Sequence, residues 1–243
     1  PFHGEKTPSF TVDEERNLFY CFGCHEGGDV FKFIMKSENC NFMDAVKFLA
    51  NKYGIPIPER QKTAAEIARE QKAKQVIETN ELAARFYQAC LTKSSYGKAA
   101  LTYLRKRGIS DEIISSFSIG YALNSFDSLL NALGKRGYSQ ELLMQAGLAV
   151  PGKNSGAYDK FRNRVMIPIK DPRGRIVGFT GRILGDGMPK YMNTGETEYF
   201  IKRYLLFGLD IAVNEIRKTR QAIVVEGHMD AISLHAAGVT NAV

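Results

Sequence analysis

Two cysteines and a histidine near the N-terminus have the residue types and the spacing of a metal site. Cys21 and Cys24 form a C-x2-C pair, and Gly23 between them allows a turn tight enough for both thiolates to reach one ion. His3 offers a third ligand, and the ligand atoms of one zinc site should lie within about 4 Å of one another. His25 is the rival for the third position, although a residue adjacent to a ligating cysteine usually points away from the ion. The alternative for the cysteine pair is a redox-active dithiol.

Two carboxylates close to the C-terminus form a second chemical pattern. Glu226 follows the apolar run 221–225, which predicts a buried strand, and the end of such a strand is where open α/β sheets bind ligands. Gly227 allows a close approach to the backbone, and Asp230 can face the same side from the first turn of a helix that continues through Leu234. Carboxylate oxygens suit Mg²⁺. The alternative is that these acids only stabilise a helix N-terminus.

Positive charge is concentrated in one part of the chain. Of the 243 residues, 33 are Lys or Arg and 26 are Asp or Glu, a formal net charge of +7. Residues 160–220 contain 13 of the former and 6 of the latter, so they carry the whole excess (13 − 6 = +7). This favours a surface that faces a polyanion, most simply a nucleic acid. The alternative is a solvated basic face that serves solubility.

Composition excludes several classes of protein. Hydrophobic residues make up 44% and charged residues 24%, which is typical of a globular protein rather than a disordered or fibrous one. The sequence contains no apolar run of the roughly 18 residues that a membrane span needs. Residues 1–6 lack the charged and apolar regions of a signal peptide.

Hydrophobic periodicity and turn residues predict the elements that position these groups. Asn41 and Gly54 suit the start and the end of a helix, and residues 171–174 (DPRG) suit a hairpin turn led by proline. In chain order we expect short strands over 9–12 and 18–21, helices within 29–53, a long and largely exposed helix over 62–91, further helices over 98–150, strands over 165–169 and 175–179, and a last strand over 221–225.

Several motifs, in a fixed order, resemble one family. The run PFHGEKTPSF from Pro1 with the later CFGC resembles the zinc-binding domain of bacterial DNA primases of the DnaG type. The stretch from Lys160 to Leu209 (FRNRVMIPI, GFTGR, PKYMN and FGL) resembles the core of the same family, as do LRKRGI and FSIGY before it. VEGHMD, from Val225, resembles the opening motif of the Toprim domain. Each motif is short, but their common order covers nearly the whole chain.

This resemblance implies an α+β fold: a small zinc ribbon domain, a mixed α/β primase core and the start of a truncated Toprim α/β sheet. The zinc-ribbon DNA-binding domain would span 1–58, a helical linker 59–80, the N-terminal subdomain of the core 81–215 and the start of the Toprim subdomain 216–243. In the family, a cysteine directly precedes the proline that corresponds to Pro1, and an Asp-x-Asp pair follows on a later strand. We therefore expect a chain open at both ends, with a fourth zinc ligand before Pro1, that makes no primers alone.

The resemblance also implies an activity. A DNA primase is a nucleotidyltransferase that synthesises short RNA primers on single-stranded DNA for replication. Glu226 and Asp230 would be catalytic, with Glu226 on the magnesium side and able to act as a general base. His3, Cys21 and Cys24 would hold zinc. The basic residues expected in the groove for template and nucleotide are Arg107, Arg182, Lys190 and Lys202, with Glu226 in the same groove.

Cofactors and partners follow from the same resemblance. We expect a structural Zn²⁺ and a catalytic Mg²⁺ or Mn²⁺. The expected partners are a single-stranded DNA template, ribonucleoside triphosphates, a replicative helicase and a single-stranded-DNA-binding protein, at the replication fork of the bacterial cytoplasm and away from any membrane. Three alternatives stay open: a phage-type primase–helicase, a non-catalytic zinc-ribbon module that binds nucleic acid, and a Toprim nuclease or topoisomerase.

Overall fold

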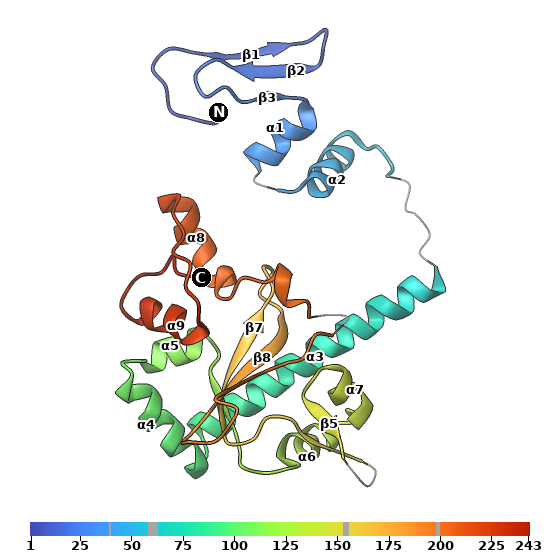
Figure 1. The fold of residues 1–243 in the computed structure, drawn as a ribbon. Helices are drawn as coiled ribbons and strands as arrows, with labels where there is room; N and C mark the ends of the chain where they lie inside the picture. The colour runs from blue at the N-terminus through green and yellow to red at the C-terminus, as the bar shows by residue number, and fades with distance from the viewer. Residues whose placement is uncertain (39, 58–62, 153–155, 198–199) are drawn as a thin grey trace. The chain divides into compact units, whose positions relative to one another are not determined.

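The computed structural model describes residues 1–38, 40–57, 63–152, 156–197 and 200–243 (Figure 1). The chain divides into two compact units, Pro1–Lys62 and Thr63–Val243. The predicted boundary between a ribbon over 1–58 and a linker over 59–80 lies outside the described residues. Helices and antiparallel strands occur in both units, so the α+β prediction is confirmed.

The first unit is a small antiparallel sheet followed by two helices. Its strands, in the order β1-β2-β3, are β1 (Phe10–Asp13), β2 (Leu18–Cys21) and β3 (Gly27–Gly28). The interior consists mainly of aromatic rings: Phe2, Phe10, Phe19 and Phe33 lie with their ring centroids 5.4–6.0 Å apart. Such a cluster is a small core for a unit of this length, which makes a metal site a natural addition.

The two helices of the first unit, α1 (Val30–Ser37) and α2 (Phe42–Tyr53), have the limits that local capping predicts. The Asn41 side chain accepts a hydrogen bond from the N–H of Asp44 and begins α2. Gly54 ends it in the left-handed conformation, with φ of 66°. The predicted start and end of this helix are confirmed.

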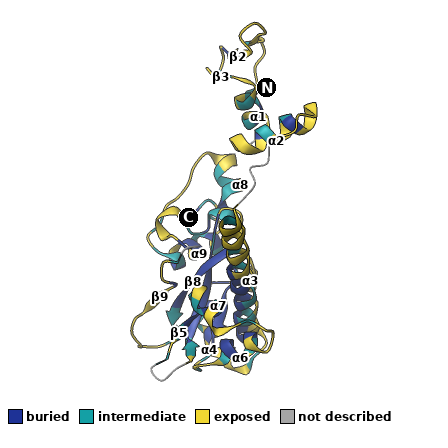
Figure 2. Ribbon diagram, turned by 90° about the vertical axis from the view of Figure 1, so that its right-hand side faces the viewer, coloured by how far each residue is buried: buried dark blue, intermediate teal, exposed yellow. Residues whose placement is uncertain are grey.

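The second unit is organised around the long helix α3 (Ala64–Thr92). A capping box between Thr63 and Glu66 begins the helix. Its first half is mostly exposed, whereas a stripe from Val76 to Leu91 is buried (Figure 2), as expected for a helix whose later part docks on a core. The predicted core, by contrast, begins only at residue 81. Asn80 Nδ2 donates to the carbonyl of Ile176 at 3.2 Å, which ties this helix to the sheet.

A four-stranded antiparallel sheet lies beside α3 (Figure 1). Its strands, in the order β4-β7-β8-β9, are β4 (Gly120–Ala122), β7 (Arg164–Lys170), β8 (Ile176–Ile183) and β9 (Tyr191–Asn193). The turn between β7 and β8 is the predicted one, because the Asp171 carboxylate accepts hydrogen bonds from the N–H groups of Arg173 and Arg175 at 2.9 and 3.0 Å. The hairpin prediction is confirmed.

Both faces of this sheet are covered. Met166 and Phe179 pack in one apolar cluster with residues of α3, whereas Val165 and Ile167 pack in a second cluster with Ile232, because alternate strand residues face opposite sides. The remaining elements surround these clusters: η1 (Ser95–Gly97), α4 (Lys98–Lys106), α5 (Asp111–Ser116), α6 (Ser128–Gly134), α7 (Gln140–Gln145), β5 (Ala149–Pro151), β6 (Ala157–Asp159), η2 (Lys202–Tyr204), α8 (Leu209–Thr219) and α9 (His228–Ala236).

The carboxylate of Asp159, in β6, caps helix α6 from a distant part of the chain. It accepts hydrogen bonds from the N–H groups of Leu129 and Leu130 at 2.8 and 3.0 Å and from the Ser128 hydroxyl at 3.0 Å. Asp127, which directly precedes the helix, makes no capping hydrogen bond. The helix N-terminus therefore depends on a buried residue of a different element.

We expect Asp159→Ala to lower the free energy of unfolding by about 2–4 kcal/mol, because it leaves two buried N–H groups without an acceptor. Chemical denaturation followed by circular dichroism would measure the change. Asp127→Ala is the matched control, since it removes an exposed carboxylate from the same helix start, and we expect a loss below about 0.5 kcal/mol. Equal losses in the two variants would show that Asp159 is not the cap that matters.

Residues 221–225 differ from the prediction of a buried strand. They are extended, but Ile223 forms only an isolated parallel bridge, with Ala242, and Val224 is 70% exposed. A buried parallel strand needs neighbours on both sides, and among the described residues only 241–243 make backbone-to-backbone hydrogen bonds with this segment. The segment still leads into α9, as predicted. No helix of the described chain is both long enough and apolar enough to cross a membrane.

Candidate functional site

The three predicted zinc ligands come together at one end of the small sheet of the first unit. The ligand atoms of His3, Cys21 and Cys24 all lie within 4.8 Å of one another, and His3 Nδ1 is 3.7 Å from Cys21 Sγ. The spread is somewhat wider than the expected 4 Å. A Cβ on Gly23 would lie 2.4 Å from His3 Nε2, so any larger residue at position 23 would displace the His3 ring.

His25, the rival ligand, lies apart from this cluster. Its backbone is left-handed, with φ of 59°, and its Nδ1 is 3.2 Å from the hydroxyl of Tyr20. Among the described residues, the metal-binding group contains His3 and the two cysteines without His25. The geometry therefore favours His3 as the third ligand.

A second layer of hydrogen bonds holds the ligands in place, and sequence reasoning missed it. Glu5 Oε2 is 3.0 Å from His3 Nε2, so the ring nitrogen that faces away from the sulfurs has a carboxylate partner. Ser9 donates its N–H to Glu5 Oε1 at 2.9 Å, and its hydroxyl hydrogen-bonds to the same carboxylate. A carboxylate on the outer nitrogen of a ligating histidine is a recurrent feature of zinc sites. An acidic residue two positions after His3 was the available signal.

Ser9 also acts on the sulfur side of the cluster. Its hydroxyl is 3.4 Å from Cys21 Sγ and accepts the N–H of Gly23 at 3.1 Å. The hydrogen bond between the Ser9 hydroxyl and Cys21 Sγ, together with the backbone N–H groups of Cys24 and Gly23, lowers the pKa of the Cys21 thiol to about 7. Two thiols and one imidazole form a donor set that suits zinc, and they would supply three of the four ligands that a structural site needs.

We expect Glu5→Gln to weaken zinc binding by about 10- to 100-fold, because the amide is a weaker partner for the His3 ring than the carboxylate. Competition with a chromophoric chelator would measure the zinc affinity directly. Glu14→Gln makes the same change at an exposed turn residue and should leave the affinity unchanged. Equal affinities of the Glu5 and Glu14 variants would remove Glu5 from the site.

In the second unit, two of the predicted basic residues share an aromatic neighbour. Arg107 directly follows α4, and Arg182 lies near the end of β8. The Cζ atoms of these residues are 5.0 and 5.3 Å from the ring centroid of Tyr103. The Arg182 guanidinium also lies 5.1 Å from the ring of Tyr191 and donates to its hydroxyl. Each distance is short enough for a cation–π contact.

Lys190 lies directly before β9 with its side chain exposed. Its carbonyl accepts the N–H of Ile183 at 3.1 Å, which extends the pairing of β8 with β9. Lys190 directly precedes Tyr191 in the sequence, and Tyr191 is the residue that contacts Arg182. The pairing of these two strands therefore places the Lys190 backbone beside Ile183, the residue that follows Arg182.

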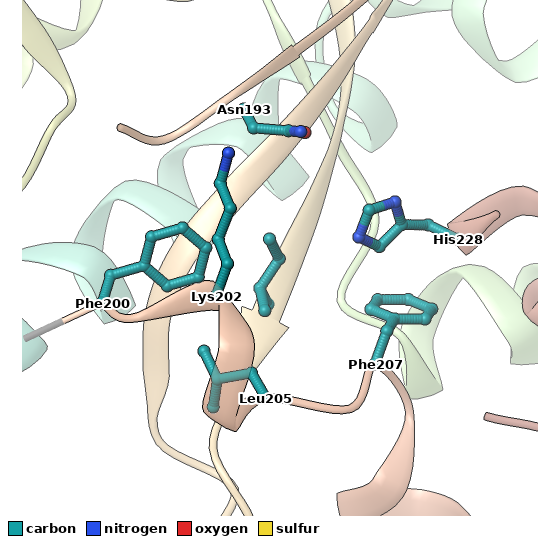
Figure 3. Close-up of a pocket in the computed structure, with 7 residues that line it drawn as sticks. Asn193, Phe200, Lys202, Leu205, Phe207 and His228 are labelled. Atoms are coloured by element: carbon teal, nitrogen blue, oxygen red, sulfur yellow. The ribbon is translucent and has the colours of Figure 1, made fainter. Parts of the chain in front are cut away.

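Lys202 belongs to a separate feature, a cavity of about 200 Å³. Asn193, Lys202 and His228 provide its polar groups, and Phe207 lies against the His228 ring with a centroid distance of 4.8 Å (Figure 3). Burial, and then the nearby charge of Lys202, lowers the pKa of His228. The histidine therefore stays neutral at physiological pH, and the cavity presents one cation together with neutral hydrogen-bonding groups.

The two predicted acids lie two residues before and two residues after His228 in the sequence, but neither of them lines the cavity. Glu226 and Asp230 are both exposed, and His228, between them, faces the cavity. A Cβ on Gly227 would lie 2.7 Å from Asp230 Oδ2, so the Asp230 carboxylate folds back over the chain that leads from Glu226. Two exposed carboxylates suit a magnesium ion that keeps several waters, since such an ion takes few protein ligands.

The predicted single groove is only partly assembled by these contacts. Neither Arg182, Lys190 nor Glu226 lines the cavity that contains Lys202. Strand β9 connects the two sites. Its first residue, Tyr191, contacts Arg182. Asn193 lies two residues later on the same face of the strand and lines the cavity. That all four basic residues act in one groove with Glu226 stays a prediction. Sequence reasoning missed Tyr103, Asn193 and His228, whose type alone gives no functional signal.

Comparison with known proteins gives matches over the whole chain. A family described as the N-terminal domain of the DNA primase catalytic core matches residues 86–213, and a CHC2 zinc finger family matches residues 1–65. A DNA primase of Deinococcus radiodurans is 44% identical over 100% of this chain and 41% of its own length. A DNA primase of Staphylococcus aureus is 43% identical over 100% of this chain and 40% of its own. The chain thus spans about two fifths of these relatives.

Solved structures agree with the sequence matches. The structure of the zinc-binding and RNA polymerase domains of the Aquifex aeolicus primase matches 100% of this chain and 57% of that chain, with 33% identity and a TM-score of 0.64. A DnaG primase catalytic domain bound to single-stranded DNA matches 71% of this chain and 56% of that chain, with 37% identity and a TM-score of 0.67. The similarity therefore extends to the fold of both units.

Proposed function

Because this chain belongs to the family of DnaG-type DNA primases, we propose that it contributes the zinc ribbon and part of the polymerase core of an enzyme that synthesises RNA primers on single-stranded DNA. The main support is the 44% identity to a DNA primase across the entire chain, together with the cluster of His3, Cys21 and Cys24. The zinc-finger match supports a structural Zn²⁺.

We assign binding of the template to the arginine pair and its surroundings. The charges of Arg107 and Arg182 have no carboxylate within 4.0 Å among the described residues, so both remain available to a phosphodiester. Arginine can hold a phosphate through two hydrogen bonds, and Lys190 adds a point charge beside it. The zinc ribbon, carried on the segment before α3, would contact the template as well. Binding should then weaken steeply as salt is raised.

The cavity of Lys202 suits the phosphates of an incoming ribonucleoside triphosphate. Lys202 offers a positive charge, and Asn193 and His228 offer neutral donors and acceptors at the same opening (Figure 3). Glu226 and Asp230, on either side of His228 in sequence, would hold a divalent ion next to these phosphates. Such an ion polarises phosphoryl oxygens when bound. Glu226 can also accept the proton of the attacking ribose hydroxyl.

The rival functions have less support. A zinc-ribbon module without catalysis does not account for the match to the polymerase core over residues 86–213. A phage-type primase–helicase would share the same residues, so the two kinds of primase predict the same local chemistry. We place the protein at the bacterial replication fork, with a helicase and a single-stranded-DNA-binding protein as further proposed partners.

A segment exchange tests the proposal. The matching segment of the Deinococcus radiodurans primase is replaced by residues 1–243 of this chain, which gives an exchange primase. The measurement is incorporation of labelled ribonucleotides on a single-stranded template with Mg²⁺ or Mn²⁺. We expect short RNA products, as from the unaltered relative. An exchange primase that folds and binds single-stranded DNA but forms no product would contradict the proposed function.

A further inference from the structure

The ring of Tyr103 joins the two arginines of the proposed template site. Tyr103 lies in α4, and Arg107 follows it by four residues, so both face the same side of the helix. Arg182 comes from β8, a different layer of the unit, and reaches the same ring. Tyr103 is thus the contact at which an arginine from the helix and an arginine from the sheet meet.

Arg182 is fixed from its other side by the sheet itself. Tyr191 is its direct cross-strand partner in the pairing of β8 with β9. Its ring lies 5.1 Å from the guanidinium, and its hydroxyl accepts a hydrogen bond from it. With Tyr103 at 5.3 Å, two aromatic rings restrict the orientation of one guanidinium. Arg107 has no second ring among the contacts of the described residues, so Tyr103 is its main restraint.

Two like charges at one ring repel each other, and the repulsion needs compensation. Among the described residues no carboxylate pairs with Arg107 or Arg182, so an acidic neighbour does not supply it. The negative face of an aromatic ring attracts a cation and offsets part of the repulsion. Both charges thereby stay beside one ring and unneutralised, which is the arrangement that a polyanion would complete.

The ring of Tyr103 makes these contacts, while its hydroxyl lies close enough for the charges of Arg182 and Arg107 to oppose the rise in its pKa that burial causes. The hydroxyl oxygen is buried and makes no hydrogen bond of normal distance and angle among the described residues. The side chain packs at the margin of the apolar cluster that includes Leu104 and Ile109. A role in packing alone would be met by another apolar side chain, such as leucine, whereas a role towards the arginines requires an aromatic ring.

We propose that Tyr103 is a positioning residue, whose ring holds Arg107 and Arg182 together as one phosphate-binding pair for the single-stranded template. This inference rests on the proposed function for its ligand, and on the contacts alone for the pairing of the two arginines. It predicts that phenylalanine can replace Tyr103, because the ring is kept, and that leucine cannot.

The first test is independent of DNA. In the ¹⁵N-labelled 243-residue chain, the side-chain Nε–Hε signals of Arg107 and Arg182 are assigned with Arg107→Lys and Arg182→Lys variants. Rings beside these groups shift the signals from their random-coil positions. We expect Tyr103→Phe to preserve the shifts and Tyr103→Leu to move the Arg107 signal to its random-coil position and to change the Arg182 signal. Unchanged signals in Tyr103→Leu would overturn the pairing of the arginines.

The second test measures binding of a fluorescent single-stranded oligonucleotide over a range of salt concentrations. Tyr103→Leu should bind roughly three- to tenfold more weakly, with a salt slope reduced by about 0.7 for each phosphate that the variant no longer neutralises. Tyr103→Phe should match the wild type. In an Arg182→Ala background, Tyr103→Leu should cost less than it does alone.

The outcomes separate the inference from the proposed function. Loss of the arginine shifts with unchanged affinity and slope would overturn the role of Tyr103 in binding. Equal loss of affinity in the leucine and phenylalanine variants would also overturn it, because only the leucine variant lacks the aromatic ring. A wild-type chain with no salt-dependent binding of single-stranded DNA would refute the template assignment, whereas the arginine signals would still report on the pairing.

Discussion

Glu226→Gln in the exchange primase is expected to reduce ribonucleotide incorporation about a thousandfold. The substitution keeps the shape of the side chain but removes the charge that would hold a divalent ion, and such an ion contributes several kcal/mol to transition-state stabilisation. Glu226 is exposed, so the variant should fold normally. Incorporation of labelled ribonucleotides under saturating Mg²⁺ measures the loss.

Glu215→Gln is the matched control for this prediction. It removes one negative charge from α8, where the half-buried Glu215 pairs with the exposed Lys218 at 3.5 Å. We expect activity within about twofold of the wild type, since exposed ion pairs contribute little. If Glu226 only stabilised the start of α9, its loss would cost no more than about 1 kcal/mol of stability and leave incorporation intact. That result would move the catalytic centre away from this motif.

Removal of zinc should unfold the first unit and leave the second unit folded. The strands of the first unit have four, four and two residues, and its interior consists mainly of four phenylalanine rings. Binding of a structural zinc ion supplies about 10–16 kcal/mol of folding free energy in small domains of this kind. The second unit has its own apolar clusters and does not share the ligands.

Hydrogen exchange of the two units before and after chelation measures this effect. We expect the amides of β1 and β2 to lose protection while those of β7 and β8 keep it. Addition of zinc should restore the original pattern, and magnesium should not. If β1 and β2 stay protected when the chelator is in large excess over zinc, the aromatic cluster alone is sufficient to fold this unit.

Local chemistry explains which features could be predicted from the sequence. Asn41 begins helix α2 because its side chain accepts a hydrogen bond from a residue of the first turn, and Gly54 ends it because its backbone adopts the left-handed conformation. Likewise, Asp171 organises a turn of its own neighbours. The zinc ligands could be predicted because few residue types bind zinc and C-x2-C spacing constrains geometry. In each case the interacting groups are close in sequence or of a rare type.

Features that depend on distant residues could not be predicted. The capping of α6 by Asp159 joins residues about thirty positions apart, and nothing in either segment indicates the other. The same is true of Tyr103 and Arg182, which meet across a helix and a sheet. Arg164 belongs to the basic stretch by sequence, yet it is only 3% exposed and donates to the carbonyl of Gly181 at 3.0 Å. Net charge therefore overestimated the surface that can face DNA.

The apolar run 221–225 shows a different limit. Composition predicts a buried strand, but burial depends on how many neighbours the sheet provides, and a run of residues does not contain that information. Ile223 pairs on one side only, with Ala242. The acidic motif after the run could still be located, because its position relative to α9 depends on the local turn at Gly227.

Template-directed synthesis is the property that distinguishes a primase from a protein that only binds DNA and nucleotides. The decisive measurement is the base composition of the RNA that the exchange primase makes on two single-stranded templates of different sequence. We predict that each product is complementary to its own template and that leaving out one required ribonucleotide stops synthesis at the matching position. Products of the same composition on both templates, or no product from a folded exchange primase that binds DNA, would contradict the assignment of this chain to primer synthesis.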